Sequence, residues 1–300
     1  MQNLDLKKIE QMCPQELSQW VAQCESRFLS QFDSLEAVDT ARILFLSGPS
    51  CSGKTTTSQL LSQRLRAQGK EVVTVSTDDF FLDTHLAPRN PDGTPNYESF
   101  DFIDSDLLLQ VVEDICQGRP YRMPSFDFKT KSRRLPEKPT LPTGNEVILV
   151  EGIHALNDKF QERCAHLDCA GIYICPGEIL FLNGRMLFEK DDIRFLRRLV
   201  RDHRHRNTTA METFHIWQNV LEGEDLFITP FLKNAQVFFS STFAYEPFLM
   251  KAQALPLLEQ VPDTSPFRFK ANSLKERLNR LIDLPQDLLP AGSLLNEFLR

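Results

Sequence analysis

The stretch Ala41-Arg-Ile-Leu-Phe-Leu-Ser-Gly-Pro-Ser-Cys-Ser-Gly-Lys-Thr55 decides which fold this sequence can adopt. Its first half is a short apolar run typical of a buried strand. Its second half is a glycine-rich turn that matches the pattern G-x-x-x-x-G-K-[ST]. Residues 54–68 then have the character of a helix that stops at Gly69. A strand, a glycine-rich turn and a helix in this order predict a loop that binds phosphate groups.

The positions of this pattern have separate chemical tasks. The glycines let backbone N–H groups turn toward the phosphates, Lys54 can reach the β and γ oxygens, and the Thr55 hydroxyl can ligate Mg²⁺. The other positions contribute mainly their backbone. The predicted nucleotide-binding residues of this loop are Gly48, Pro49, Ser50, Cys51, Ser52, Gly53, Lys54, Thr55 and Thr56.

Four further apolar runs predict buried strands, at 71–76, 146–151, 171–175 and 235–239. Strands that alternate with helical segments are typical of an α/β domain built around a parallel sheet. Residues 83–143 form a long polar insert between the second and third strands, with an acidic helix predicted over 104–116. A connection of this length favours a substrate-binding region over a plain connector.

Acidic residues end two of these strands. Asp78 and Asp79 follow the second strand and Glu151 ends the third, on the edge of a parallel sheet where α/β sites form. An aspartate there can take the proton of a hydroxyl acceptor, and Glu151 can hold Mg²⁺ through water. A nucleoside monophosphate kinase would need cations instead, and the N-K-x-D motif of switch GTPases is absent from the sequence. His154 is expected to be packed rather than catalytic.

Residues 194–206 contain six arginines and one aspartate. Read as a helix, the segment has an apolar stripe beside a cationic stripe of Arg194, Arg197, Arg198 and Arg201. A capping box at Thr209 predicts the next helix, with Arg206 in the loop between the two. Such a segment can close over a nucleotide and bring arginine to the charge of the transferring group.

The composition of the chain argues against several classes of function and indicates a cellular location. The 300 residues include 34 Lys and Arg against 41 Asp and Glu, a net charge of −7 that argues against broad binding to nucleic acid or to an anionic membrane. No run approaches 18 apolar residues, and the first residues lack a secretory h-region. The seven scattered cysteines are typical of reduced thiols. The expected location is the cytoplasm.

Six segments, in order, resemble the uridine kinase and phosphoribulokinase family: GPSCSGKTT (48–56), VSTDDFF (75–81), NYESFDFID (96–104), PSFDFKTKSRR (124–134), VEGIHAL (150–156) and RRLVRDHRHR (197–206). The resemblance covers about 41–262, and the closing LLPAGSLLNEFLR looks like the tail of a less characterised bacterial branch. It implies a P-loop NTPase fold, a parallel sheet flanked by helices with an arginine-bearing lid, and an enzyme that uses ATP and Mg²⁺.

The resemblance also implies roles for individual residues. Asp78 matches the base that takes the proton of the ribose 5′-hydroxyl, and Glu98 falls where the family has an aspartate that grips the ribose hydroxyls. Arg198, Arg201 and Arg206 match the lid arginines, of which Arg198 and Arg201 are expected to be catalytic together with Lys54. Glu151 matches the acid near the metal.

Two departures concern the acceptor. The uridine-cytidine kinases supply a tyrosine and a histidine to the pyrimidine, where this sequence has Phe126 and Lys131. Lysine donates hydrogen bonds and accepts none, so it suits uracil O4 and makes cytidine the poorer substrate. Lys131 could equally serve a carboxylate or phosphate on another acceptor.

We therefore expect a kinase that phosphorylates a hydroxyl of a small metabolite, with uridine as the first candidate. A sugar phosphate, a pantothenate-like acid or a modified nucleoside are alternative acceptors, and a nucleotide-sensing or RNA-binding protein without turnover is the alternative from another class. The expected organisation is a helical extension (1–38), a kinase domain (39–262) and a helical tail (263–300). The face of Trp20, Phe28 and Phe32 on the helix predicted over 14–32 and the leucine-rich tail are candidate homo-oligomer interfaces.

Overall fold

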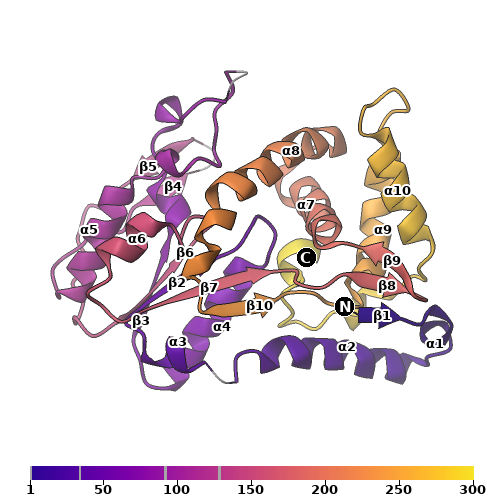
Figure 1. Cartoon of the computed structure of the whole chain (residues 1–300), viewed down its shortest axis with the longest axis horizontal. Coiled ribbons are helices and arrows are strands. Elements are labelled where there is room, and N and C mark those ends of the chain that lie inside the picture. The colour runs from indigo at the N-terminus through magenta and orange to yellow at the C-terminus, as the bar shows by residue number, and fades with distance from the viewer. Residues whose placement is uncertain (1, 34, 91–92, 128–129) are drawn as a thin grey trace.

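The computed structural model describes residues 2–33, 35–90, 93–127 and 130–300. Five parallel strands form its central sheet in the order β10-β7-β2-β6-β3 (Figure 1). In chain order these strands are β2 (Ile43–Ser47), β3 (Val72–Ser76), β6 (Val147–Glu151), β7 (Cys169–Cys175) and β10 (Val237–Ser240). Each overlaps one of the predicted apolar runs, although β7 starts two residues earlier and β10 ends one residue later than predicted, so the prediction of a parallel α/β sheet is confirmed.

The carboxyl ends of these strands share one edge of the sheet. Ser47 at the end of β2 pairs with Tyr173, and Ser76 at the end of β3 pairs with Glu151. The glycine-rich loop after β2 and the acidic turn after β3 therefore start from the same edge, which is where ligands bind in open α/β sheets.

Each face of the sheet is covered by its own hydrophobic cluster, because alternate residues of a strand point to opposite sides. Leu44 and Leu46 of β2 belong to the larger cluster, whereas Ile43 and Phe45 belong to the smaller one. The larger cluster includes residues of α2 (Pro14–Ser30), α4 (Lys54–Ala67), α7 (Lys190–Arg206), α8 (Ala210–Phe227), α9 (Glu246–Glu259) and α10 (Arg268–Asn279). The smaller cluster includes residues of α5 (Ser105–Cys116) and α6 (Asp158–Arg163).

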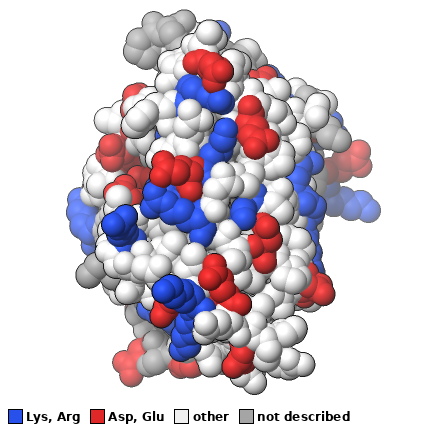
Figure 2. Space-filling model, turned by 90° about the vertical axis from the view of Figure 1, so that its right-hand side faces the viewer, with Lys and Arg blue, Asp and Glu red and all other residues white. Residues whose placement is uncertain are grey.

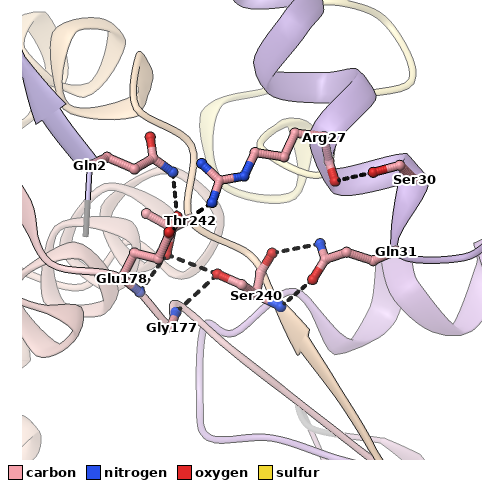
Figure 3. A network of polar contacts seen from close by, with 8 residues as sticks. All are labelled: Gln2, Arg27, Ser30, Gln31, Gly177, Glu178, Ser240 and Thr242. Carbon is pink, nitrogen blue, oxygen red and sulfur yellow. Dashed lines mark hydrogen bonds and ion pairs between the residues drawn. The ribbon is translucent and has the colours of Figure 1, made fainter.

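The N-terminal residues are joined to the sheet by a second, three-stranded sheet and by polar side chains. Strand β1 (Gln2–Leu4) pairs with β8 (Leu180–Leu182), which pairs with β9 (Arg185–Phe188). Figure 3 shows Gln2 and Arg27 meeting the Glu178 carboxylate, with 2.8 Å between Arg27 Nη2 and Oε1. Gln31 also exchanges two hydrogen bonds with the backbone of Ser240 on edge strand β10. The two Gln31 hydrogen bonds therefore cover the end of strand β10, which would otherwise be an open edge of the sheet.

The insert predicted at 83–143 packs through its apolar residues on the sheet face that carries the smaller hydrophobic cluster. It contains helix α5, whose N-cap Asp104 accepts a hydrogen bond from Leu107 N, and the antiparallel hairpin β4 (Ser125–Asp127) with β5 (Ser132–Arg134). The helix predicted at 104–116 is therefore confirmed. Short helical elements complete the described chain: α1 (Leu6–Glu10), α3 (Glu36–Thr40), α11 (Asn296–Leu299) and 3₁₀ turns at Thr77–Phe80, Thr84–Leu86, Phe100–Phe102, Thr229–Asn234 and Gln286–Leu288.

The arginine-rich helix differs from its prediction in two respects. Arg206 lies in the last turn of α7 and not in the following loop, because the left-handed Asn207 (φ 53°) ends the helix one residue later. Arg194 and Arg197 are fully buried, so the four arginines do not form one cationic face. The capping box from Thr209 to Glu212 starts α8 as predicted. Over the described ranges, no helix is long and apolar enough to span a bilayer.

Candidate active site

The P-loop takes the conformation that its sequence predicts. Gly53 has φ 94°, a left-handed backbone that glycine adopts without strain, and a Cβ at Gly48 would collide with the carbonyl of Ile174. The Lys54 ammonium donates to the carbonyls of Gly48 (2.8 Å) and Pro49 (3.1 Å), which holds it over its own loop. Helix α4 starts at Lys54, so its N-terminus faces the loop and favours an anion there.

A cavity of about 1420 Å³ opens in front of this loop. Its walls come from the P-loop, the acidic turn after β3, the insert, and helices α7 and α8. Most of the site residues predicted from the sequence line it: Ser50, Cys51, Ser52, Gly53, Lys54, Thr55, Asp78, Glu98, Phe126, Lys131, Glu151, Arg198, Arg201 and Arg206. Gly48 and Pro49 of the loop and Thr56 in the first turn of α4 are not among the residues that line it.

The structure separates the two aspartates of the acidic turn. Asp78 lines the cavity, and burial raises its pKa to about 6, with repulsion from Glu151 adding to the effect and Lys54 opposing it. Asp79 instead accepts a hydrogen bond from the backbone N–H of Phe126 (3.1 Å) and so positions the hairpin of the insert. Of the two, Asp78 is the carboxylate that can meet a substrate.

Two glutamates stand near Asp78. Glu151 accepts a hydrogen bond from Ser76 Oγ (2.7 Å), which orients its carboxylate at the end of β6. Glu98 packs against helix α8 so closely that a Cβ at Gly223 would lie 2.8 Å from its own Cβ. Burial raises the pKa of Glu98, while the positive charges of Arg198 and Lys54 oppose that rise.

Three cavity arginines converge on one carboxylate that the sequence reading missed. Asp202 is 2% exposed and pairs with Arg198 Nε (3.1 Å), Arg201 Nη2 (3.2 Å) and Arg206 Nη1 (3.3 Å). Arg198 also donates to Ser50 Oγ of the P-loop (3.0 Å). The spacing of Asp202 four residues from both Arg198 and Arg206 was a usable signal, since residues four apart share a helix face.

The two buried arginines hold the P-loop from behind. Arg197 pairs with Glu246 (Nη2 to Oε2, 2.7 Å) and donates to the carbonyl of Cys51 (3.1 Å). Arg194 pairs with Glu224 and donates to the carbonyl of Ser50 (3.2 Å). Both side chains are 0% exposed, so they support the loop and cannot reach a ligand.

Aromatic rings and polar groups form the far end of the cavity. The Phe126 ring meets Phe81 edge-on with 5.6 Å between centroids, and Phe102 and Tyr97 belong to the same aromatic group. Lys131 lines the cavity from a left-handed backbone position (φ 55°). Four more residues that were not predicted as site residues line this cavity: Tyr97, Asn207, His215 and Asn219. Tyr97 lies in the quoted segment 96–104, and the other three lie in none of the quoted segments.

His154 is packed, as expected. It is 1% exposed and its ring lies edge-on to Phe100 and Phe227. Burial lowers its pKa to about 4, so the imidazole is neutral near pH 7. A neutral ring among phenylalanines contributes to packing and has no access to substrate.

Comparisons with known proteins identify the family of this chain. The model of the phosphoribulokinase/uridine kinase family matches residues 43–244. A uridine kinase of Staphylococcus epidermidis is 28% identical over 65% of this chain and 85% of its own length, and one of Brevibacillus brevis is 29% identical over 65% and 82%. Among solved structures, a putative fructose transport system kinase from Silicibacter sp. TM1040 aligns at 19% identity and a TM-score of 0.46, over 73% of this chain and 98% of its own. The chain therefore belongs to the phosphoribulokinase/uridine kinase family and is a small-molecule kinase.

Proposed function

We propose that this protein transfers the γ-phosphate of ATP to a hydroxyl of a small metabolite, with the 5′-hydroxyl of uridine as the first candidate acceptor. The observation that carries the proposal is the position of Asp78. This carboxylate lies in the same cavity as the P-loop lysine and the arginines, so a base for a hydroxyl and a cradle for phosphates face one space.

In the proposed reaction, Asp78 takes the proton of the acceptor hydroxyl as its oxygen bonds to the γ-phosphorus. The bond between that phosphorus and the bridging oxygen breaks, and ADP leaves. Lys54, Arg198 and Arg201 stabilise the negative charge on the transferring group, which is the main contribution that a protein makes to phosphoryl transfer. Asp202 holds the arginines in place beforehand, so little reorganisation is needed.

Thr55 and Glu151 are the residues that would hold Mg²⁺. Both line the cavity and offer hard oxygen ligands, one hydroxyl and one carboxylate, and Mg²⁺ is usually bound through few protein ligands with several waters. Among the described residues there is no group of three His, Cys, Asp or Glu side chains that could form an all-protein metal cage. The bound ion would neutralise charge on the β and γ oxygens.

The acceptor end of the cavity favours a neutral polyol over a phosphorylated one. Asp78 and Glu98, which lie close enough for the charge of Glu98 to affect Asp78, would repel an acceptor that already carries phosphate. The aromatic group around Phe126 provides an apolar surface against which a base can stack. The names of the relatives add uridine as the first compound to test.

Lys131 supports a second candidate acceptor, a hydroxy acid whose carboxylate would pair with its ammonium. A panel of uridine, cytidine, sugar phosphates, a pantothenate-like acid and modified nucleosides with γ-labelled ATP separates the candidates. Transfer of label to uridine above all others supports the proposal, and transfer only to an acid or a phosphorylated sugar refutes its acceptor.

The alternative of an RNA-binding protein has little support in the surface. The basic helix α7 has its Arg194 and Arg197 fully buried and its Arg198, Arg201 and Arg206 paired with Asp202. Figure 2 shows basic and acidic side chains interspersed over the face that includes α10. In the labelled-ATP assay, nucleotide binding without transfer to any acceptor would favour this alternative.

A further inference from the structure

The last residues of the chain reach the P-loop. We call residues 293–300 the C-terminal segment; Figure 1 shows it in yellow beside helix α7. A Cβ at Gly53 would collide with the side chain of Leu294, which packs directly against this glycine. The ring of Phe298 lies under the guanidinium of Arg197, 5.0 Å from its carbon, and that guanidinium donates to the P-loop carbonyl of Cys51.

This segment is a fixed part of the molecule. Leu294, Leu295, Phe298 and Leu299 are each 3% exposed or less and belong to the larger hydrophobic cluster. Ser293 Oγ donates to the Glu25 carboxylate (2.6 Å). At the other end, the carbonyl of Arg300 accepts from Arg204 Nη2 (3.3 Å). Displacing the segment would expose four apolar side chains, so a bound nucleotide has to fit against it as it stands.

Glu297 is the residue of this segment that lines the cavity. Its Oε2 accepts a hydrogen bond from Thr56 Oγ1 (3.2 Å), in the first turn of α4 and two residues after Lys54. The carboxylate also lies close enough to Arg201 to help raise the pKa of that arginine, against the lowering effect of burial. The Glu297 carboxylate therefore lies in the cavity wall beside the first turn of α4, next to the loop that is expected to hold the phosphates.

The chemistry of a carboxylate restricts what it can contact there. An ionised carboxylate accepts hydrogen bonds and donates none, so it gains nothing from phosphate oxygens. A nucleotide offers donors only on its ribose hydroxyls and on its base. The ribose is joined directly to the α-phosphate, so its hydroxyls are the first donors beyond the phosphates that the P-loop cradles.

We infer that Glu297 accepts a hydrogen bond from a ribose hydroxyl of the phosphate donor and so makes the site selective for ribonucleotides. The inference rests on the proposed use of a nucleoside triphosphate. It also assigns a role to a residue outside the 43–244 range that the family model matches. A hydrogen bond from a hydroxyl to a charged acceptor strengthens ligand binding by about 10- to 100-fold.

Calorimetric titration of the full-length protein with Mg²⁺ present tests this inference. The ligands are ADP, 2′-deoxy-ADP, 3′-deoxy-ADP and inorganic tripolyphosphate, which has no ribose. The wild-type protein should bind ADP about 10- to 100-fold more tightly than the deoxynucleotide that lacks the contacted hydroxyl. Glu297→Ala should weaken ADP to the level of that deoxynucleotide and leave tripolyphosphate binding as tight as before or tighter. Glu276→Ala is the matched control, because Glu276 is an exposed glutamate on α10 paired with Arg280, and it should change neither affinity.

Several outcomes would overturn the inference. Unchanged ADP affinity in Glu297→Ala with an unchanged preference over deoxynucleotides would show that the side chain only packs. Tighter binding of both ADP and tripolyphosphate would show that it only repels phosphate. A wild-type protein that binds ADP no more tightly than either deoxynucleotide also refutes it.

A second variant covers a failure to fold. If Glu297→Ala lowers the melting temperature and binds neither ligand, Glu297→Gln decides, because it keeps the shape and removes the charge. It should retain tripolyphosphate binding with a reduced preference for ribose over deoxyribose, and a full preference would refute the inference. The proposed reaction fails separately: a protein that shows the ribose preference yet phosphorylates no acceptor refutes the reaction and leaves the inference standing.

Discussion

Asp78→Asn is the substitution that tests the proposed chemistry most directly. The amide keeps the size of the side chain and cannot take a proton from a hydroxyl. General base catalysis contributes about 10² to 10⁴ in rate, so kcat should fall by that factor. The affinity for ATP should stay nearly the same, because Asp78 faces the acceptor while Lys54 and the P-loop hold the phosphates.

The pKa of Asp78 sets the pH dependence of the wild-type reaction. A base with a pKa of about 6 is mostly ionised at pH 7 and about one-tenth ionised at pH 5. Log kcat/KM should therefore rise with a slope near 1 below pH 6 and flatten above it, since this ratio reports the groups of the free enzyme. Asp78→Asn should lose this step from its residual activity.

The same pKa predicts a change in stability with a definite sign. Burial raises the pKa of Asp78 from 3.8 to about 6. Its ionisation therefore lowers the stability of the fold progressively as the pH rises from about 3.8 to about 6, and the full loss is present above pH 6. The rise corresponds to at most about 3 kcal/mol. Asp78→Asn should therefore be more stable than the wild type at pH 8, with a difference that shrinks as the pH falls toward 4.

Initial rates with γ-labelled ATP over pH 5–9, together with urea unfolding at pH 4.5 and 8, measure both effects. Asp79→Asn is the matched control, because its Oδ1 still accepts from Phe126 N and the residue does not line the cavity. Turnover within a few-fold of wild type in Asp78→Asn would refute the role of this aspartate. Equal losses in Asp78→Asn and Asp79→Asn would assign the effect to the local charge.

Three further substitutions test other parts of the site. Lys131→His should improve cytidine relative to uridine, because a neutral imidazole can accept from the cytosine amino group; an unchanged ratio of kcat/KM would show that Lys131 does not face the base. Asp202→Asn should lower kcat by about 10- to 100-fold with a smaller change in the KM for ATP, since it releases arginines that act on the transferring group; an unchanged kcat would remove Asp202 from this positioning role. Arg197→Ala should destabilise the fold by about 3–5 kcal/mol in urea unfolding, because it leaves Glu246 buried and unpaired. Adding Glu246→Gln should recover part of that loss, and a double variant no more stable than Arg197→Ala would contradict the ion-pair argument.

Local pattern was sufficient for the elements of the central sheet. Strands such as β2 and β6 bury both faces, so they appear as continuous apolar runs, and the glycines of the P-loop announce their turn by type and spacing. Strands β1, β8 and β9 were missed. β1 pairs with β8 across about 180 positions, for which a single sequence carries no local signal. β8 and β9 instead form a hairpin across Asn183 and Gly184, both at positive φ, so this Asn-Gly pair was a usable turn signal.

The arginine helix illustrates where pattern misleads. Its sequence predicted a cationic stripe, and Arg194 and Arg197 are buried instead because Glu224 and Glu246, on two later helices, supply their partners. The burial of a charge depends on whether an opposite charge is brought beside it, and that is decided by packing between distant segments.

By itself, the sequence determined the parallel α/β sheet, the phosphate loop and the two acidic strand ends, because each is set by residues within a few positions of one another. Tertiary structure alone decided that Asp78 and not Asp79 lines the cavity, and that Arg194 and Arg197 are fully buried while other arginines of α7 line it. It also brought Glu297 Oε2 to 3.2 Å from Thr56 Oγ1, although the two residues are 241 positions apart. Those facts depend on where the chain returns after long connections, and the energy that places it there is spread over the whole hydrophobic core.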